Sequence, residues 1–143
     1  MPLTALTYSE PGTHPDWQLV MLHGWGANAA DLLGLAPYLR LANFSMMFPD
    51  APWPHPQVPG GRMWYSFPLG YDFRRPHDFD QQEDLQTTRQ MLHSWLIELS
   101  QTSQIPLERT ILAGFSQGGA MNLDMGSQLP LAGQIILSGY LHS

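Results

Sequence analysis

The sequence predicts an α/β fold, a mostly parallel sheet with flanking helices. Short, almost fully apolar segments alternate with segments whose apolar residues recur at helical spacing. A strand that is almost fully apolar must be covered on both faces of its sheet, as the strands of parallel sheets are. The residues best suited to chemistry follow the predicted strands, where parallel sheets bind ligands. With 143 residues, 43% of them hydrophobic and 13% charged, the chain is expected to form one globular domain, 1–143.

Each element has its own sequence signal. Strands are expected over 3–8, 17–22, 44–48, 110–115 and 134–137. The first alternates apolar and polar residues, as an edge strand does. Helices are expected after Asn28, with Asp31 completing a capping box and Pro37 ending the helix early; from a second capping box formed by Asp80 and Glu83; and over 117–128.

The segment 50–79 has neither a helical nor a strand period. It contains six prolines, three glycines and seven aromatic residues, and so many aromatic residues argue against disorder. A loop this long inside a compact domain is usually functional. Packing over the core and lining a substrate site are both expected uses, and one does not exclude the other.

Composition and charge exclude several classes of function. The net charge is −6, with six arginines and no lysine, which argues against nucleic acid and an anionic membrane surface as partners. There is no cysteine, so neither a disulfide nor a thiolate metal site is possible. No apolar run approaches the ~18 residues of a membrane span, and the N-terminal residues do not read as a signal peptide. We expect a cytoplasmic protein without a membrane span.

The chemistry centres on Gly114-Phe115-Ser116-Gln117-Gly118-Gly119, between a predicted strand and a predicted helix. This is the context of a nucleophile elbow, a sharp turn that exposes a reactive serine. Gly114 and Gly118 are expected because a Cβ at either position would collide with neighbouring backbone. The alternative is a purely structural glycine-rich turn.

A serine nucleophile needs an oxyanion hole with two convergent N–H donors. The backbone of Gln117 is expected to supply one, and that of Trp25 the other, from the loop after the strand 17–22. Glycines at 24 and 26 allow that loop to approach Ser116 closely.

Four motifs occur in order: Leu22-His23-Gly24-Trp25-Gly26, Phe48-Pro49-Asp50-Ala51-Pro52, Gly114-Phe115-Ser116-Gln117-Gly118-Gly119-Ala120 and Leu137-Ser138-Gly139-Tyr140-Leu141. Together they resemble the carboxylesterase/lysophospholipase group of the α/β-hydrolases, which includes acyl-protein thioesterases. The resemblance implies a serine carboxylic-ester or thioester hydrolase that needs no metal or cofactor. Its implied site consists of Ser116 as nucleophile, the Trp25 and Gln117 N–H groups as oxyanion hole, and acyl-binding residues Trp53, Met63, Trp64 and Tyr65.

The sequence departs from that family in one respect. There, the acid and histidine of the triad follow the serine after two further strands, so we expect the 143 residues to lack the C-terminal portion of the domain. No residue here inherits those roles. His23 belongs to the oxyanion-loop motif, His142 is expected at the surface, and Asp124 is expected to be exposed or to cap a neighbour.

The sequence is therefore compatible with three functions. The first is an esterase or thioesterase acting on a small-molecule or acyl-chain ester. The second is a non-catalytic acyl- or lipid-binding remnant of such an enzyme. The third is an oligomerising structural domain, because the strand Gln134-Leu137 is predicted to be an unpaired apolar edge suited to self-association.

Overall fold

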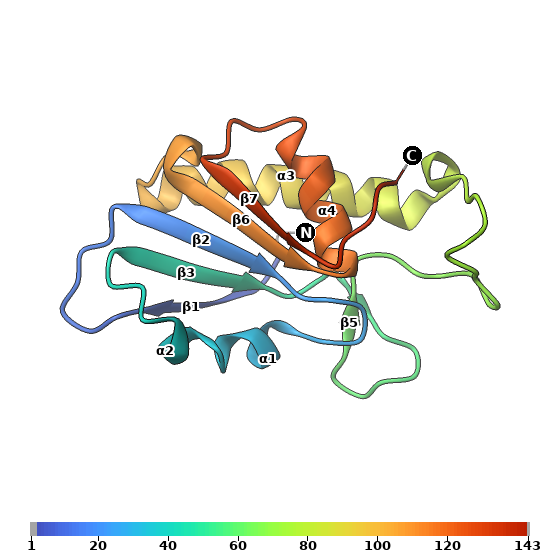
Figure 1. Ribbon diagram of the computed structural model, residues 1–143, viewed down its shortest axis with the longest axis horizontal. Coiled ribbons are helices and arrows are strands. Elements are labelled where there is room, and N and C mark those ends of the chain that lie inside the picture. Colours follow the sequence, from blue (N-terminus) through green and yellow to red (C-terminus); the bar gives the residue numbers. More distant parts are fainter. Residues whose placement is uncertain (1–2, 143) are drawn as a thin grey trace.

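The computed structural model describes residues 3–142 (Figure 1), whose main element is a five-stranded sheet in the order β1-β3-β2-β6-β7. Its strands are β1 (Ala5–Ser9), β2 (Trp17–Leu22), β3 (Phe44–Pro49), β6 (Thr110–Phe115) and β7 (Gly133–Leu137). Two short strands, β4 (Trp53–Pro54) and β5 (Arg62–Met63), pair as a separate hairpin. The helices are α1 (Ala29–Leu33), α2 (Ala36–Leu39), α3 (Glu83–Ser103) and α4 (Gln117–Gly126), with 3-10 turns at Phe79–Gln81 and Leu107–Arg109.

The strand pairing confirms the predicted α/β class. β3, β2, β6 and β7 run parallel to one another, and β1 pairs antiparallel with β3 at one edge. β7 lies at the other edge, as predicted for the last strand. Because β2 and β6 are neighbours in register, with Leu22 opposite Gly114, the loops after these two strands emerge side by side.

Local signals at the helix ends were partly right. Asn28 caps α1 through the predicted capping box with Asp31, and the helical segment is interrupted at Gly34 and Leu35, before Pro37, which lies in the first turn of α2. The capping box predicted for Asp80 and Glu83 is wrong. Asp80 lies in the 3-10 turn capped by Asp78, and α3 starts at Glu83 without a side-chain cap. The preceding turn has displaced the N-cap of the helix by two residues relative to the sequence pattern, from Asp80 to Gln82.

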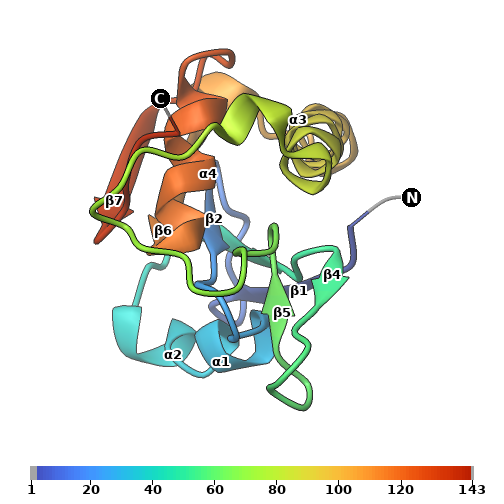
Figure 2. The same cartoon turned by 90° about the vertical axis from the view of Figure 1, so that its right-hand side faces the viewer.

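The helices lie on opposite faces of the sheet (Figure 2), with α3 and α4 on one face and α1 and α2 on the other. Alternation along the strands sends Val20 and Leu112 toward α3 and α4, and Leu19 and Ala113 toward α1 and α2. Both sets are buried. Within residues 3–142, no helix combines the length and apolarity that crossing a bilayer requires.

The long segment 50–79 packs over the end of the sheet as an irregular loop, which confirms one of its two expected uses. Trp64 and Tyr65 have no exposed surface and belong to the main core cluster. Burial of these aromatic residues therefore helps to hold the loop in place, together with the β4–β5 hairpin.

Candidate active site

Ser116 occupies a strained turn between β6 and α4. Its backbone has φ 56° and ψ −115°, in the left-handed range of φ that side chains other than glycine rarely adopt. A Cβ on Gly114 would lie 2.3 Å from the Gly118 carbonyl oxygen, and a Cβ on Gly118 would lie 2.4 Å from that of Leu22. Both glycines are thus required sterically, as the sequence predicted.

The loop after β2 lies directly against this turn. A Cβ on Gly24 would be 3.5 Å from the Ser116 Cβ, so the two loops are in van der Waals contact. The Gly26 N–H donates to the Arg62 carbonyl at 2.8 Å, which ties the loop to β5. Among residues 3–142, neither the Trp25 N–H nor the Gln117 N–H donates to another backbone carbonyl. Both N–H groups are thus without a backbone carbonyl partner, in segments that adjoin Ser116.

The side chain of Gln117 has a role that sequence reasoning missed. It is fully buried; its Oε1 accepts from the Trp64 N–H and its Nε2 donates to the Tyr65 carbonyl, both at 2.8 Å. The Trp64 indole in turn donates to the His23 carbonyl at 2.8 Å. These bonds join the turn at Ser116, the loop 50–79 and the loop after β2 to one another.

His23 is a structural histidine. It is fully buried; its Nε2 accepts from the Ala51 N–H at 3.0 Å, so its Nδ1 carries the proton and donates to the Gly24 carbonyl at 2.8 Å. Burial lowers its pKa below the ordinary value of 6.5, although the Gly24 hydrogen bond and the Asp50 charge oppose that shift. A neutral ring with both nitrogens engaged is not free to act as the base for Ser116.

His142 was predicted at the surface, and this prediction is wrong. Its side chain is only 2% exposed, with Nδ1 2.7 Å from the Asp124 carboxylate and Nε2 2.6 Å from the Tyr65 hydroxyl. Aromatic packing of His142 against Tyr65 and Phe79 holds the segment after β7 inward. Since both ring nitrogens have partners, His142 does not bond to Ser116.

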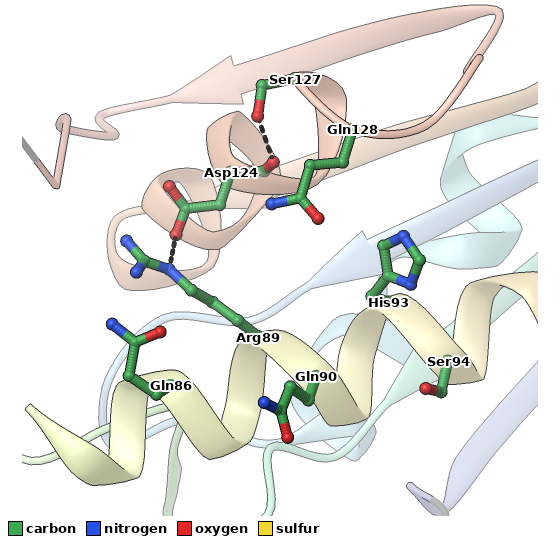
Figure 3. Close-up of a pocket in the computed structure, with 8 residues that line it drawn as sticks. All are labelled: Gln86, Arg89, Gln90, His93, Ser94, Asp124, Ser127 and Gln128. Atoms are coloured by element: carbon green, nitrogen blue, oxygen red, sulfur yellow. Dashed lines mark hydrogen bonds and ion pairs between the residues drawn. The ribbon is translucent and has the colours of Figure 1, made fainter. Parts of the chain in front are cut away.

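Asp124 is likewise more buried than predicted. Its carboxylate accepts from His142 and, at 2.8 Å, from Arg89 of α3 (Figure 3). Burial alone would raise its pKa, but the bonds from His142 and Arg89 outweigh burial and hold the pKa below its ordinary value. Beside this ion pair, side chains of α3 and of α4 and its C-terminal end line a polar cavity of about 430 Å³. The sequence offered no signal for it, because Arg89 and Asp124 are 35 positions apart.

The predicted acyl-binding residues occupy different environments. Trp64 and Tyr65 are core residues, whereas Trp53 and Met63 are partly exposed. The Trp53 indole donates to Thr88 of α3 at 3.1 Å and its side chain lines a cavity of about 360 Å³ beside Arg62 and Met91. Within residues 3–142, no three histidine or carboxylate side chains converge as metal ligands would.

The family described as Phospholipase/Carboxylesterase matches residues 7–143. This chain belongs to that family. The resemblance inferred from the four motifs is thereby confirmed, as is the α/β-hydrolase type of fold.

Two relatives are named acyl-protein thioesterase 1. The protein from Kluyveromyces lactis is 28% identical over 149 residues, which cover 98% of this chain and 64% of the relative. The protein from Yarrowia lipolytica is 32% identical over 136 residues, covering 86% of this chain and 56% of the relative. The crystal structure of esterase PE8 superposes with a TM-score of 0.86 at 26% identity, covering 100% of this chain and 66% of the other. The chain thus spans less than two thirds of the length of each.

Proposed function

We propose that this chain carries the nucleophile of a serine carboxylic-ester or thioester hydrolase. Ser116 would attack the substrate carbonyl, the alcohol or thiol would leave, and water would release the acyl group from Ser116. The observation that supports this best is the strained, glycine-flanked turn that holds Ser116 between β6 and α4, against the loop of Gly24. Names of the relatives agree with this reaction type.

The backbone N–H groups of Trp25 and Gln117 are proposed as the oxyanion hole. Both lie in segments packed around Ser116, and Gln117 begins α4, whose N-terminal end favours negative charge. Loss of one such donor costs about 100- to 1000-fold in rate. The hydrogen bonds of the Gln117 side chain to Trp64 and Tyr65 help to hold the backbone of Gln117 in position.

The general base is proposed to come from outside residues 3–142. Within these residues, both nitrogens of His23 and of His142 are engaged elsewhere.

The substrate is proposed to be an ester or thioester with an apolar acyl group. Trp53 and Met63 are the predicted residues with surface available to a ligand, while Trp64 and Tyr65 would shape the site from behind. Ester and thioester remain equal alternatives. The cytoplasmic location predicted from the sequence also stays a prediction.

A fluorophosphonate probe tests the nucleophile. We expect weak labelling of the 143-residue chain, lost in Ser116→Ala and kept in Ser138→Ala, a control residue that also has a positive φ of 55°. Labelling that survives Ser116→Ala contradicts the assignment. Because absence of labelling fits a site without a base, the same pair of variants is needed in a form extended to the length of the relatives.

The second candidate function is non-catalytic acyl or lipid binding. The observation in its favour is that both ring nitrogens of His23 and of His142 are engaged away from Ser116. An extended form that binds a fatty acyl ligand but neither labels nor hydrolyses p-nitrophenyl esters would favour this candidate over the enzyme.

Self-association through β7 is proposed as a further property. β7 is an edge strand, and the side chains of Ile135 and Leu137 are about half exposed, at 45% and 51%. Size-exclusion chromatography coupled to light scattering tests it. A monomer at every concentration would count against this proposal and against the structural-domain alternative.

A further inference from the structure

Five aromatic side chains enclose a cavity that the proposed function does not use. Each contacts the next in a closed circuit, and we name this set the aromatic cage: Tyr71, Phe73, Tyr140, Phe79 and His77. Neighbouring ring centroids are 4.6–6.4 Å apart. All five side chains line one cavity of about 270 Å³.

Most neighbouring rings of the cage are steeply inclined to each other, whereas the planes of Phe79 and Tyr140 meet at 33°. The planes of Tyr71 and Phe73 meet at 88°, those of Tyr71 and His77 at 90°, and those of His77 and Phe79 at 82°. Phe79 is buried and lies on the side of the cage that faces the core, whereas Phe73 is 64% exposed. The cage is therefore built on the core but open to solvent.

The size of the cavity limits its occupant. About 270 Å³ lies just below the ~300 Å³ at which small-molecule sites begin. A single compact group fits this space better than a long acyl chain does.

Acidic side chains lie near the cage, but among the described residues no carboxylate lines its cavity. The two arginines of this loop, Arg74 and Arg75, both pair with the Asp72 carboxylate, at 3.0 and 3.7 Å. Arg75 also lines the cavity, but its charge is shared with that carboxylate. Asp78 and Asp80 follow at the next turn, so the segment 72–80 carries three acidic and two basic side chains, besides His77. Burial and, to a smaller extent, the charge of Asp72 raise the pKa of Tyr71.

We propose that the aromatic cage binds an organic cation of the quaternary or methylated ammonium class. Several π-faces around one compact cavity suit such a cation, because each ring presents negative charge on its face and the cation is weakly hydrated. A neutral group of the same shape would gain the apolar contact but not the electrostatic attraction. The cage is separate from Ser116, so the proposal does not depend on the proposed hydrolase.

A matched pair of ligands tests the proposal on the unaltered chain. Choline and its neutral isostere 3,3-dimethylbutan-1-ol have the same shape around the head group and differ in charge. We expect saturable binding of choline that is about threefold to tenfold tighter than binding of the isostere. Tryptophan emission is one readout, because Trp25 contacts Phe67, which contacts both Tyr71 and Phe73. NMR titration is the second.

Variants of Phe73 separate cation recognition from simple burial. Phe73 is largely exposed, so we expect its replacement to leave the fold intact. Phe73→Leu keeps apolar area and removes the π-face, and we expect a loss of about threefold to tenfold in choline affinity with little change for the isostere. Phe73→Trp should restore or tighten binding. Tyr38→Leu, at an aromatic residue of α2 that is 83% exposed, is the control and should change neither affinity.

Two results would overturn the proposal. One is equal or tighter binding of the neutral isostere, which would make the cavity an ordinary apolar pocket. The other is the lack of saturable choline binding by the unaltered chain. Ser116→Ala should bind choline as the unaltered chain does, so failure here and failure of the proposed hydrolase are distinguishable.

Discussion

The two faces of the sheet differ in how completely they are covered. On the face of α3 and α4, Val20 and Leu112 are fully buried against these helices. On the opposite face, α1 and α2 lie under the β1–β3 side of the sheet, away from β7 (Figure 2). There, at the β6–β7 end, Phe115, Ile135 and Leu137 are about half exposed, at 52%, 45% and 51%.

Strand register places these three side chains on the same face. Ile135 lies opposite Ala113 and Leu137 opposite Phe115, so the exposed residues continue the surface that is buried under α1 further along the sheet. Helices therefore cover one face of this sheet completely and the other face only in part. Substitutions should therefore have very different consequences on the two faces.

The largest effect is expected at the turn around Ser116, where the fully covered face of the sheet meets the candidate site. In Gly118→Ala, the new Cβ would lie 2.4 and 2.5 Å from the carbonyl oxygens of Leu22 and His23, which are backbone atoms that cannot move aside cheaply. We expect a loss of more than about 3 kcal/mol in the free energy of unfolding, measured by urea denaturation.

Gly60→Ala is the matched control for that substitution. Gly60 also has a positive φ, 75°, but no atom lies within 4 Å of the position of its Cβ. Only the backbone preference is then lost, about 1–2 kcal/mol. Equal losses in the two variants would contradict the steric explanation of the elbow.

Next in size is truncation on each face of β6. Leu112→Ala removes a fully buried side chain next to α4, and we expect it to cost about 2–5 kcal/mol. Ile111→Ala removes a partly buried side chain from the other face and should cost less than about half as much. Chemical denaturation of both variants measures the difference. Similar costs would show that the second face is as well packed as the first.

Acid should weaken the region around the buried His23. Its pKa is lower in the folded state than the ordinary 6.5 of the unfolded chain, so the folded state binds that proton less tightly. The free energy of unfolding should therefore be at its full value above about pH 6.5 and fall as the pH decreases below it.

His23→Gln isolates this contribution. Its amide oxygen can still accept from the Ala51 N–H, but the side chain does not titrate. Urea denaturation at about pH 7.5 and about pH 5.5 should show a smaller decrease for the variant than for the unaltered chain. An unchanged decrease would assign the acid sensitivity to other groups.

The smallest effect on stability is expected at the exposed edge. Leu137→Lys places a charge on a half-exposed position and should change the free energy of unfolding by no more than about 0.5 kcal/mol. It should nonetheless abolish association through β7, because a charged edge strand resists pairing. Light scattering of the variant beside the unaltered chain measures this; unchanged association would place the contact elsewhere.

Sequence patterns were reliable where the physical cause is local. The β2, β3 and β6 strands were predicted almost to the residue, because runs of apolar residues bounded by turn residues define them. The capping box at Asn28 and the glycines around Ser116 were predicted from short-range sterics and hydrogen bonding, and the structure confirms both. The capping box at Asp80 failed because an additional 3-10 turn satisfies the same pattern differently.

What the sequence determined by itself was the α/β class, the turn at Ser116 and the resemblance to a family to which the chain proves to belong. Tertiary structure alone decided the environments of Asp124 and His142, the side-chain bonds of Gln117, and the closing of five rings into the aromatic cage. The reason is physical: strands and tight turns depend on neighbouring residues, whereas a buried ion pair or a cage depends on which distant segments come into contact. Tyr71 and Tyr140 are 69 positions apart, and no local pattern reports that they line one cavity.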